Sequence, residues 1–205
     1  MAIRTAVNRA LTAITALPTA AALVNGNLTL LTTATASSSA TLDFTSSIDS
    51  TYDSYMFKFY DMHPANDQVD FMFNFSTDGG SNYNVAKTST QIIAYNHEGG
   101  AGQGLQYNAN QDIAQGTGFD FVVSDVGNAN DEAGSGSITL FNPSSTTFVK
   151  HYLIRGVIGN GAYAQDELKG GYGNTTSAIN AVQFKFISGN IDAGVIKMYG
   201  VGPKQ

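Results

Sequence analysis

The sequence predicts an all-β fold: an antiparallel, jelly-roll-like β-sandwich preceded by a short N-terminal arm that is helical or extended. Apolar and polar residues alternate with a period of two in about ten short segments, which is the pattern of strands with one buried face. Clusters of Gly, Asn, Asp, Ser and Pro separate these segments, and no long helical period follows residue 30. Many short strands joined by turns favour a sandwich.

The clearest alternation lies at residues 55–76, where two runs flank a short turn. One face of the two runs is mostly aromatic and comprises Tyr55, Phe57, Phe59, Val69, Phe71, Phe73 and Phe75. The other face of the second run is expected to point away from the core and comprises Asp70, Met72, Asn74 and Ser76. The turn at residues 63–67 contains Pro, Asn and Asp. The pattern predicts a β-hairpin that needs a second sheet to cover its aromatic face.

Further strands are expected on both sides of this hairpin. The segments are residues 28–35, 41–46, 83–87, 91–95, 119–123, 137–142, 147–155, 181–187 and 194–199. Turn sequences at residues 142–145 and 188–190 predict two more hairpins. Residues 96–117 and 156–176 are rich in Gly and are expected to be loops. A long uncharged loop such as 96–117 serves as a binding surface or as an arm between subunits.

We expect the chain to divide into an attachment arm, residues 1–37, and a sandwich domain, residues 38–205. In the arm, apolar residues recur at three- and four-residue spacing, as in an amphipathic helix ending before Pro18: Ile3, Val7, Leu11, Ile14 and Leu17. Such a helix either anchors the protein or packs on its own domain. Thr12, Thr15 and Pro18 interrupt the apolar stretch, so a cleaved signal peptide is not expected.

Composition restricts the classes of partner. Only 13% of the residues are charged, but 42% are hydrophobic, which excludes a disordered chain and indicates a polar, uncharged surface. Such a surface suits contact with other subunits or with carbohydrate. The net charge of −6 without a basic patch argues against nucleic acid as a partner. No run reaches the roughly 18 apolar residues of a membrane span, so no membrane partner is expected.

Two groups of residues are candidate metal sites. An acidic cluster has oxygen ligands of the kind that calcium prefers, but it lacks EF-hand spacing and is explained equally by a polar turn: Asp125, Asn128, Asn130, Asp131 and Glu132. The three histidines, His63, His97 and His151, have no metal-site spacing. The sequence therefore predicts no metal site.

The sequence also predicts no catalytic residues and no cofactor. It contains no nucleophile elbow, P-loop or dinucleotide-binding fingerprint in a strand-to-helix context. A glycosidase needs a pair of carboxylates. No spacing selects such a pair from the available acidic residues, Asp120, Asp125, Asp166 and Glu167. A non-enzymatic protein is therefore expected.

Four tyrosines in the Gly- and Asn-rich segments are the candidate ligand-binding residues: Tyr95, Tyr107, Tyr163 and Tyr172. Aromatic rings stack on apolar surfaces, and neighbouring amides hydrogen-bond hydroxyl groups, as a sugar-binding or protein-binding surface requires. The alternative is that these rings fold back over the edge of the core.

Three stretches carry a likeness to known proteins. They are residues 78–83 (DGGSNY), residues 140–151 (LFNPSSTTFVKH) and residues 174–200, which begin NTTSAIN and contain SGNIDAG. These stretches resemble virion structural proteins of tailed bacteriophages, frequent in phages of marine and freshwater bacteria, cyanophages included. The likeness covers roughly residues 38–200 and is most specific in the last fifty of these. It implies a β-sandwich virion component present in many copies, without catalytic residues.

We therefore expect a non-enzymatic virion protein on the tail or the capsid exterior. The expected form is a homotrimeric tail-fibre or baseplate-associated subunit that is attached to other virion proteins through residues 1–37. It would contribute to host-surface contact, with a host-surface glycan as the candidate ligand. Two alternatives stay open: a capsid decoration (cement) protein that clamps neighbouring capsomers, and a carbohydrate-binding module for receptor recognition.

Overall fold

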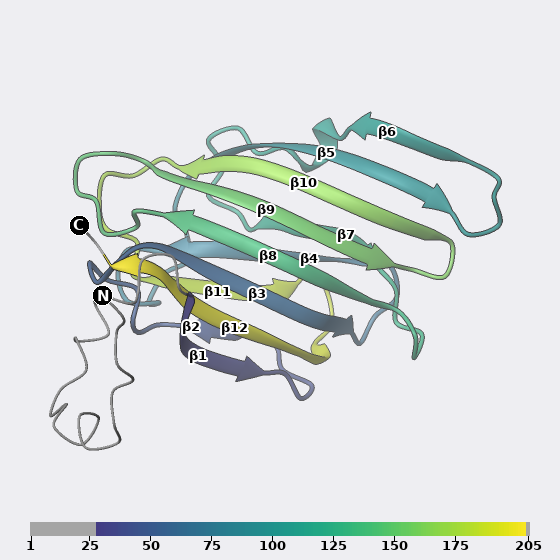
Figure 1. The fold of residues 1–205 in the computed structure, drawn as a ribbon, viewed down its shortest axis with the longest axis horizontal. Helices are drawn as coiled ribbons and strands as arrows, with labels where there is room; N and C mark the ends of the chain where they lie inside the picture. Colours follow the sequence, from purple (N-terminus) through teal and green to yellow (C-terminus); the bar gives the residue numbers. More distant parts are fainter. Residues whose placement is uncertain (1–27, 204–205) are drawn as a thin grey trace, which may run out of the picture.

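Two antiparallel β-sheets packed face to face form the protein (Figure 1). The structure is a computed structural model that describes residues 28–203. These residues form twelve strands and one turn of 3-10 helix at Ala109–Gln111. Within this part of the chain, no helix is long and apolar enough to cross a membrane. The predicted all-β antiparallel sandwich is confirmed.

The two sheets differ in size. In pairing order, the large sheet contains β1 (Leu28–Thr35), β12 (Ile191–Pro203), β3 (Tyr52–Pro64), β8 (Ala133–Phe141), β9 (Lys150–Gly159), β10 (Tyr163–Gly173), β5 (Lys87–His97) and β6 (Gln103–Tyr107). The small sheet contains β2 (Leu42–Phe44), β11 (Ala181–Phe186), β4 (Val69–Ser76) and β7 (Asp120–Val126). Figure 1 shows the large sheet from β6 at the top to β1 at the bottom, with the small sheet behind it.

Eight of the strands are connected as a jelly roll. They are β1, β2, β3, β4, β7, β8, β11 and β12. Counted from one to eight along the chain, they stand in the order 1-8-3-6 in the large sheet and 2-7-4-5 in the small sheet. This order is that of two Greek keys wrapped around a common core. The jelly-roll-like topology predicted from the sequence is therefore the one found.

Two inserted strand pairs widen the large sheet beyond the jelly roll. The pair β5–β6 follows β4, and the pair β9–β10 follows β8. Together they extend the sheet past β8 in the order β9, β10, β5 and β6. The small sheet ends at β7, which lies against β9. The inner faces of β10, β5 and β6 therefore extend beyond the edge of the small sheet.

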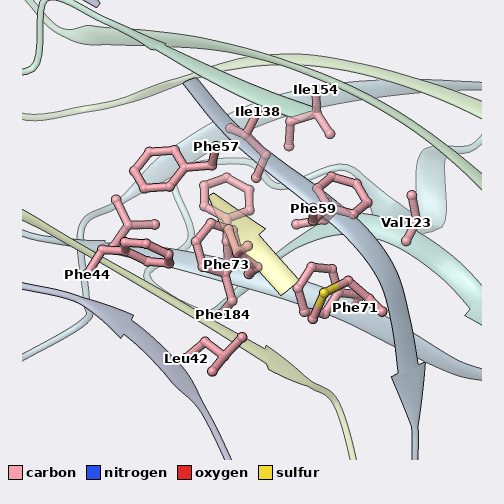
Figure 2. Close-up of a cluster of buried hydrophobic side chains, with 14 of the residues drawn as sticks. Leu42, Phe44, Phe57, Phe59, Phe71, Phe73, Val123, Ile138, Ile154 and Phe184 are labelled. Carbon is pink, nitrogen blue, oxygen red and sulfur yellow. The ribbon is translucent and has the colours of Figure 1, made fainter. Parts of the chain in front are cut away.

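The core between the sheets is built from aromatic rings (Figure 2). Phe57 and Phe59 of β3 are at most 1% exposed. The ring of Phe59 lies 5.7 Å from that of Phe71 on β4, and the ring of Phe57 lies 5.6 Å from that of Phe184 on β11. These contacts join the two sheets, and each aromatic pair adds about 0.5–1.5 kcal/mol to the gain from burying apolar area.

The hairpin predicted at residues 55–76 is wrong, because β3 belongs to the large sheet and β4 to the small sheet. The turn between them carries the chain across the sandwich, and the two aromatic runs cover each other. A flat hairpin would have left both runs exposed on the same side. The hairpin predicted around residues 188–190 is wrong for the same reason, since β11 and β12 lie in different sheets. The hairpin around residues 142–145 is confirmed, because β8 pairs with β9.

Two predicted loops contain strands. Residues 96–117 include β6, and residues 156–176 include the end of β9 and all of β10. The glycines that suggested a loop have a packing function in β10. A Cβ atom at Gly171 would lie 2.5 Å from the Tyr152 hydroxyl oxygen and 2.7 Å from the Thr88 carbonyl oxygen. Glycine is therefore needed for the buried Tyr152 side chain to fit beneath the strand.

Strand β4 is buried on both faces, whereas the alternation predicted one exposed face. Met72, Asn74 and Ser76 are all buried. The Asn74 side chain donates hydrogen bonds to the carbonyl oxygens of Tyr83 (2.6 Å) and Thr117 (3.0 Å). The loops that contain these carbonyls cover the outer face of the small sheet, which a period-two pattern cannot indicate.

The predicted strand at residues 28–35 is confirmed as β1, which pairs with β12 from Leu28–Val201 to Thr35–Val195 with one register shift between Leu30 and Thr32. This strand falls within the stretch assigned to the arm. The arm residues Ile3, Val7, Leu11, Ile14 and Leu17 lie outside the described residues.

The contact between β7 and β9 can be tested at Gly156. Gly156→Ala should lower the free energy of unfolding by about 1–3 kcal/mol, because the new Cβ would overlap Cγ1 of Val123 on β7. Urea unfolding gives the value. Gly159→Ala on the same strand is the matched control, since a Cβ there has no atom within 4 Å. Equal stabilities of the two variants would show that β7 does not pack closely on β9.

Candidate functional site

A polar cleft lies where the inserted strands extend past the edge of the small sheet. Its volume is about 430 Å³, within the range typical of ligand sites. Three parts of the chain line it. The floor comes from β5 and β10, one wall from β4 and β7, and the other wall from β6 and the segment after it. The lining residues are Asp70, Ile93, Tyr95, Gln106, Asn108, Gln111, Ser124, Asp125, Tyr163 and Gln165.

The floor carries two tyrosines on neighbouring strands. Tyr95 of β5 and Tyr163 of β10 meet edge to face, with ring centroids 5.9 Å apart. The His97 ring also packs edge to face with Tyr163, with ring centroids 4.8 Å apart. Edge-to-face contact is the preferred arrangement of aromatic pairs, so the rings hold each other in place.

The first wall is shaped by a β-bulge. Strand β7 pairs with β4 at Val126 and at Val123, and between these points Ser124 and Asp125 both stand opposite Asp70. Asp125 has a left-handed backbone with φ of 61°, which aspartate tolerates better than most residues. Its backbone N–H donates to Asp70 Oδ1 at 3.1 Å. Bulges re-aim side chains, and this one places Asp70 and Asp125 on the same wall.

The two carboxylates make this wall electronegative. Burial raises the pKa of Asp70, and the nearby charge of Asp125 acts in the same direction. The hydrogen bond from the Asp125 backbone and the charge of Lys169 oppose the rise. Carboxylate oxygens accept strong, charge-assisted hydrogen bonds, so this wall favours ligands with O–H or N–H donors.

The opposite wall presents amide side chains. Gln106 is on β6, and Asn108 and Gln111 follow it around the 3-10 turn. The Gln111 Oε1 atom is buried without a hydrogen-bond partner among the described residues. A buried unpartnered acceptor is costly unless water or a ligand supplies a donor.

Glu167 of β10 lies beneath the cleft and is 1% exposed. Its Oε1 accepts hydrogen bonds from the Ser124 backbone N–H (2.8 Å) and hydroxyl (2.7 Å), and its Oε2 accepts from the Gln91 amide. Burial raises its pKa from the usual 4.5 to about 7, against the effect of the Ser124 hydrogen bonds and the charge of Lys169. Both oxygens are occupied by protein donors, so Glu167 supports the bulge and does not face a ligand.

Next to Glu167 on the same face of β10, Lys169 forms a buried ion pair with Asp120 of β7. The Lys169 Nζ atom lies 2.7 Å from Asp120 Oδ1, and the side chains are 1% and 0% exposed. The Tyr152 hydroxyl donates to the other carboxylate oxygen at 2.5 Å, and Lys169 also donates to the Gln111 carbonyl at 2.8 Å. These bonds tie β9, β10, β7 and the second cleft wall together.

The four candidate tyrosines all lie on strands, and the cleft brings two of them together. Tyr95 and Tyr163 line the floor. Tyr107 is 62% exposed on β6 and donates its hydroxyl hydrogen to Asp112. Tyr172 lies beside the ring of His151 and accepts a hydrogen bond from the Gln115 side chain at 3.3 Å. Tyr107 and Tyr172 are not among the lining residues.

The candidate metal ligands lie far apart or contact other side chains and backbone groups. His63 lies near Asp192, whereas His97 packs on Tyr163 and His151 lies near Tyr172. Glu132 accepts a hydrogen bond from the Ala129 backbone within its own turn. Across residues 28–203, no three His, Asp or Glu side chains are grouped as a metal ion requires.

The four carboxylates from which a catalytic pair could be drawn do not form such a pair. Asp120 and Glu167 are buried in hydrogen-bond networks, while Asp166 forms a bidentate ion pair with Arg155 at 2.7 and 3.1 Å. Only Asp125 lines the cleft. The second carboxylate in the cleft lining, Asp70, is not one of these four, because the alternation of β4 predicts that it points away from the core.

The fold and the cleft thus define a class: a jelly-roll sandwich with a polar, aromatic-floored binding cleft. Comparison of the chain with protein-family models, with curated proteins and with solved structures found no match. The function is therefore inferred from the geometry and from the sequence resemblance.

The pKa of Glu167 predicts a pH dependence of stability. Between pH 4.5 and about 7 the folded protein holds a proton that the unfolded chain releases, so this group's contribution to stability falls as the pH rises through that window. Glu167→Gln should remove this slope and be more stable relative to the parent at pH 8 than at pH 5, by about 1–3 kcal/mol. The new amide can accept from Ser124, and Gln91 can turn its unpartnered Oε1 toward it.

Urea midpoints of parent and variant at the two pH values provide the measurement. Because the three histidines and the other carboxyl groups are common to both proteins, the difference between the two profiles isolates Glu167. Parallel profiles would mean that Glu167 ionises normally in the folded protein.

Proposed function

We propose that the chain is a non-enzymatic structural protein of a bacteriophage virion, a tail-fibre or baseplate-associated subunit. Residues 1–37 attach it to other virion proteins, and the sandwich presents its cleft to the host surface. The proposal is supported by the sequence resemblance and by the positions of Leu28, the first described residue, and of the cleft.

Leu28, the first described residue, lies at one end of the sandwich, and the cleft lies toward the other. We call the first the proximal end: β1 begins there, beside the last residues of β12, and β8 ends there, at the left of Figure 1. At the opposite, distal end β5 ends and β10 begins. Tyr163 is the first residue of β10, and Asp125 is the last but one of β7. A subunit held by the residues that precede Leu28 would therefore point the cleft away from the particle, and this observation carries the proposal.

Parts of the three stretches that resemble virion proteins meet at the proximal end. The Gly79 N–H donates to the Asn180 side chain at 2.8 Å, and the Ile179 N–H donates to the Pro143 carbonyl at 3.0 Å. Lys150 donates to the Thr175 carbonyl at 3.1 Å. Loops from distant parts of the sequence thus come together at the end where β1 begins, and we propose this end as the docking surface for the particle.

The proposal includes assembly as a homotrimer. The outer face of the large sheet exposes three aliphatic side chains on adjacent strands: Ile92 (45%), Leu153 (58%) and Leu168 (45%). Contact between copies would cover such side chains. The same feature favours the second candidate, a capsid decoration protein, which would clamp neighbouring capsomers through a broad face. The two roles differ in copy number.

The attachment role predicts that a chain lacking residues 1–24 folds but does not join particles. Particles produced with the full chain should contain tens of copies, whereas those produced with the truncated chain should contain none. Quantitative mass spectrometry against the major capsid protein gives both numbers, and circular dichroism of the truncated protein is the control for folding.

Normal incorporation of the truncated chain would refute the arm as the attachment element. Hundreds of copies of the full chain per particle would assign it to the capsid exterior as a decoration protein. Absence of the full chain from purified particles would refute the virion role.

A further inference from the structure

We propose that the cleft binds an uncharged saccharide unit, such as a neutral hexose or N-acetylhexosamine residue of a surface glycan. This inference rests on the proposed function, because host contact is the reason for a glycan ligand. It adds the chemical class of the ligand and the residues that select it.

The first support is a set of free polar groups. Six lining residues present hydroxyl or amide termini that make no hydrogen bond to any other described residue: Tyr95, Gln106, Asn108, Gln111, Tyr163 and Gln165. By contrast, the polar groups beneath the cleft, Glu167, Lys169 and Asp120, are engaged with one another or with neighbours. A small polyhydroxylated ligand can pair with many donors and acceptors at once, as a ligand with few polar groups cannot.

The second support is the aromatic floor. A pyranose ring has a C–H face that packs on an aromatic ring, while its hydroxyl groups point sideways to the walls. Tyr95 and Tyr163 supply the rings, and Gln106 and Asp125 stand on opposite walls. The rings are positioned by strands and not by loops, so little conformational entropy is lost on binding.

The third support is the charge of the cleft, which selects against acidic sugars. None of the described lysine or arginine side chains lines it, and the nearest buried cation, Lys169, is paired with Asp120. Asp70 and Asp125 present negative charge on one wall. A carboxylate or sulfate on the ligand would meet like charge, whereas a neutral hydroxyl group can donate to either carboxylate.

The test uses the full 205-residue chain and a panel of methyl glycosides. The neutral probes are the glycosides of glucose, galactose, mannose and N-acetylglucosamine, and the acidic probes are those of glucuronic acid and N-acetylneuraminic acid. Saturation-transfer difference NMR detects binding, and titration gives Kd. At least one neutral glycoside should bind, and the acidic glycosides should bind at least tenfold more weakly.

Variants on the same strand connect binding to the cleft. Gln106→Ala should weaken the neutral glycoside about five- to tenfold, because one hydrogen bond to the ligand is lost. Gln103→Ala should leave Kd unchanged, since Gln103 lies on β6 outside the cleft lining. Both side chains are exposed, so neither change should affect folding. Tyr163→Ala should reduce affinity tenfold or more by removing part of the floor.

The inference is overturned if no neutral glycoside binds at tens of millimolar, if the acidic glycosides bind best, or if Gln106→Ala and Gln103→Ala behave alike. Incorporation into particles is measured separately and without sugar. A chain that is incorporated but binds no glycoside refutes only the ligand assignment, and a chain that binds glycoside but is absent from particles refutes only the virion role.

Discussion

The buried pair of Asp120 and Lys169 is the interaction on which the rest of the cleft depends. It joins the last strand of the small sheet to an inserted strand of the large sheet, at the place where the aromatic core ends. Removing a charge from water is costly, and here further partners offset the cost. The Tyr152 hydroxyl donates to Asp120, Lys169 donates to the Gln111 carbonyl, and the Phe121 ring lies 5.1 Å from the Lys169 Nζ atom. Burial lowers the pKa of Lys169, and the charge and hydrogen bond of the Asp120 carboxylate act in the opposite direction.

The two halves of the interior are held together by different forces. In the jelly roll, aromatic rings from both sheets meet, and this burial needs no defined partner geometry. Beyond β7 there is no second sheet, and the inner face of β10 and β5 carries the buried polar residues Glu167, Lys169 and Gln91 next to the tyrosines of the cleft floor. Hydrogen bonds are directional, so this polar layer fixes the position of the bulge at Ser124 and Asp125. The aromatic part thus provides stability and the polar part provides a shaped wall.

The sequence was most informative where a strand has one apolar and one polar face. Ile138 and Leu140 alternate with polar residues and are buried on β8, and Val182, Phe184 and Phe186 do the same on β11. It failed where pairing is decided by distant residues: the aromatic runs of β3 and β4 face each other across the core, although their spacing is also that of a hairpin. The glycines of β10 wrongly predicted a loop, because Gly171 is needed for the Tyr152 side chain of the neighbouring strand β9 to fit.

Tyr95 and Tyr163 could be proposed from residue type alone. Asp70 and Gln106 are brought next to them only by the fold, and no local pattern distinguishes Gln106 from Gln103.

A double-mutant cycle on the buried pair tests this account most directly. Asp120→Asn and Lys169→Met are made singly and together, and the free energy of unfolding is measured by urea denaturation at neutral pH. Each single change should cost about 3–5 kcal/mol, because it leaves a buried charge without its partner. The double variant should cost at least about 2 kcal/mol less than the sum of the two, because neither charge remains. Costs that add to within about 0.5 kcal/mol would contradict the account, since the two residues would then act independently.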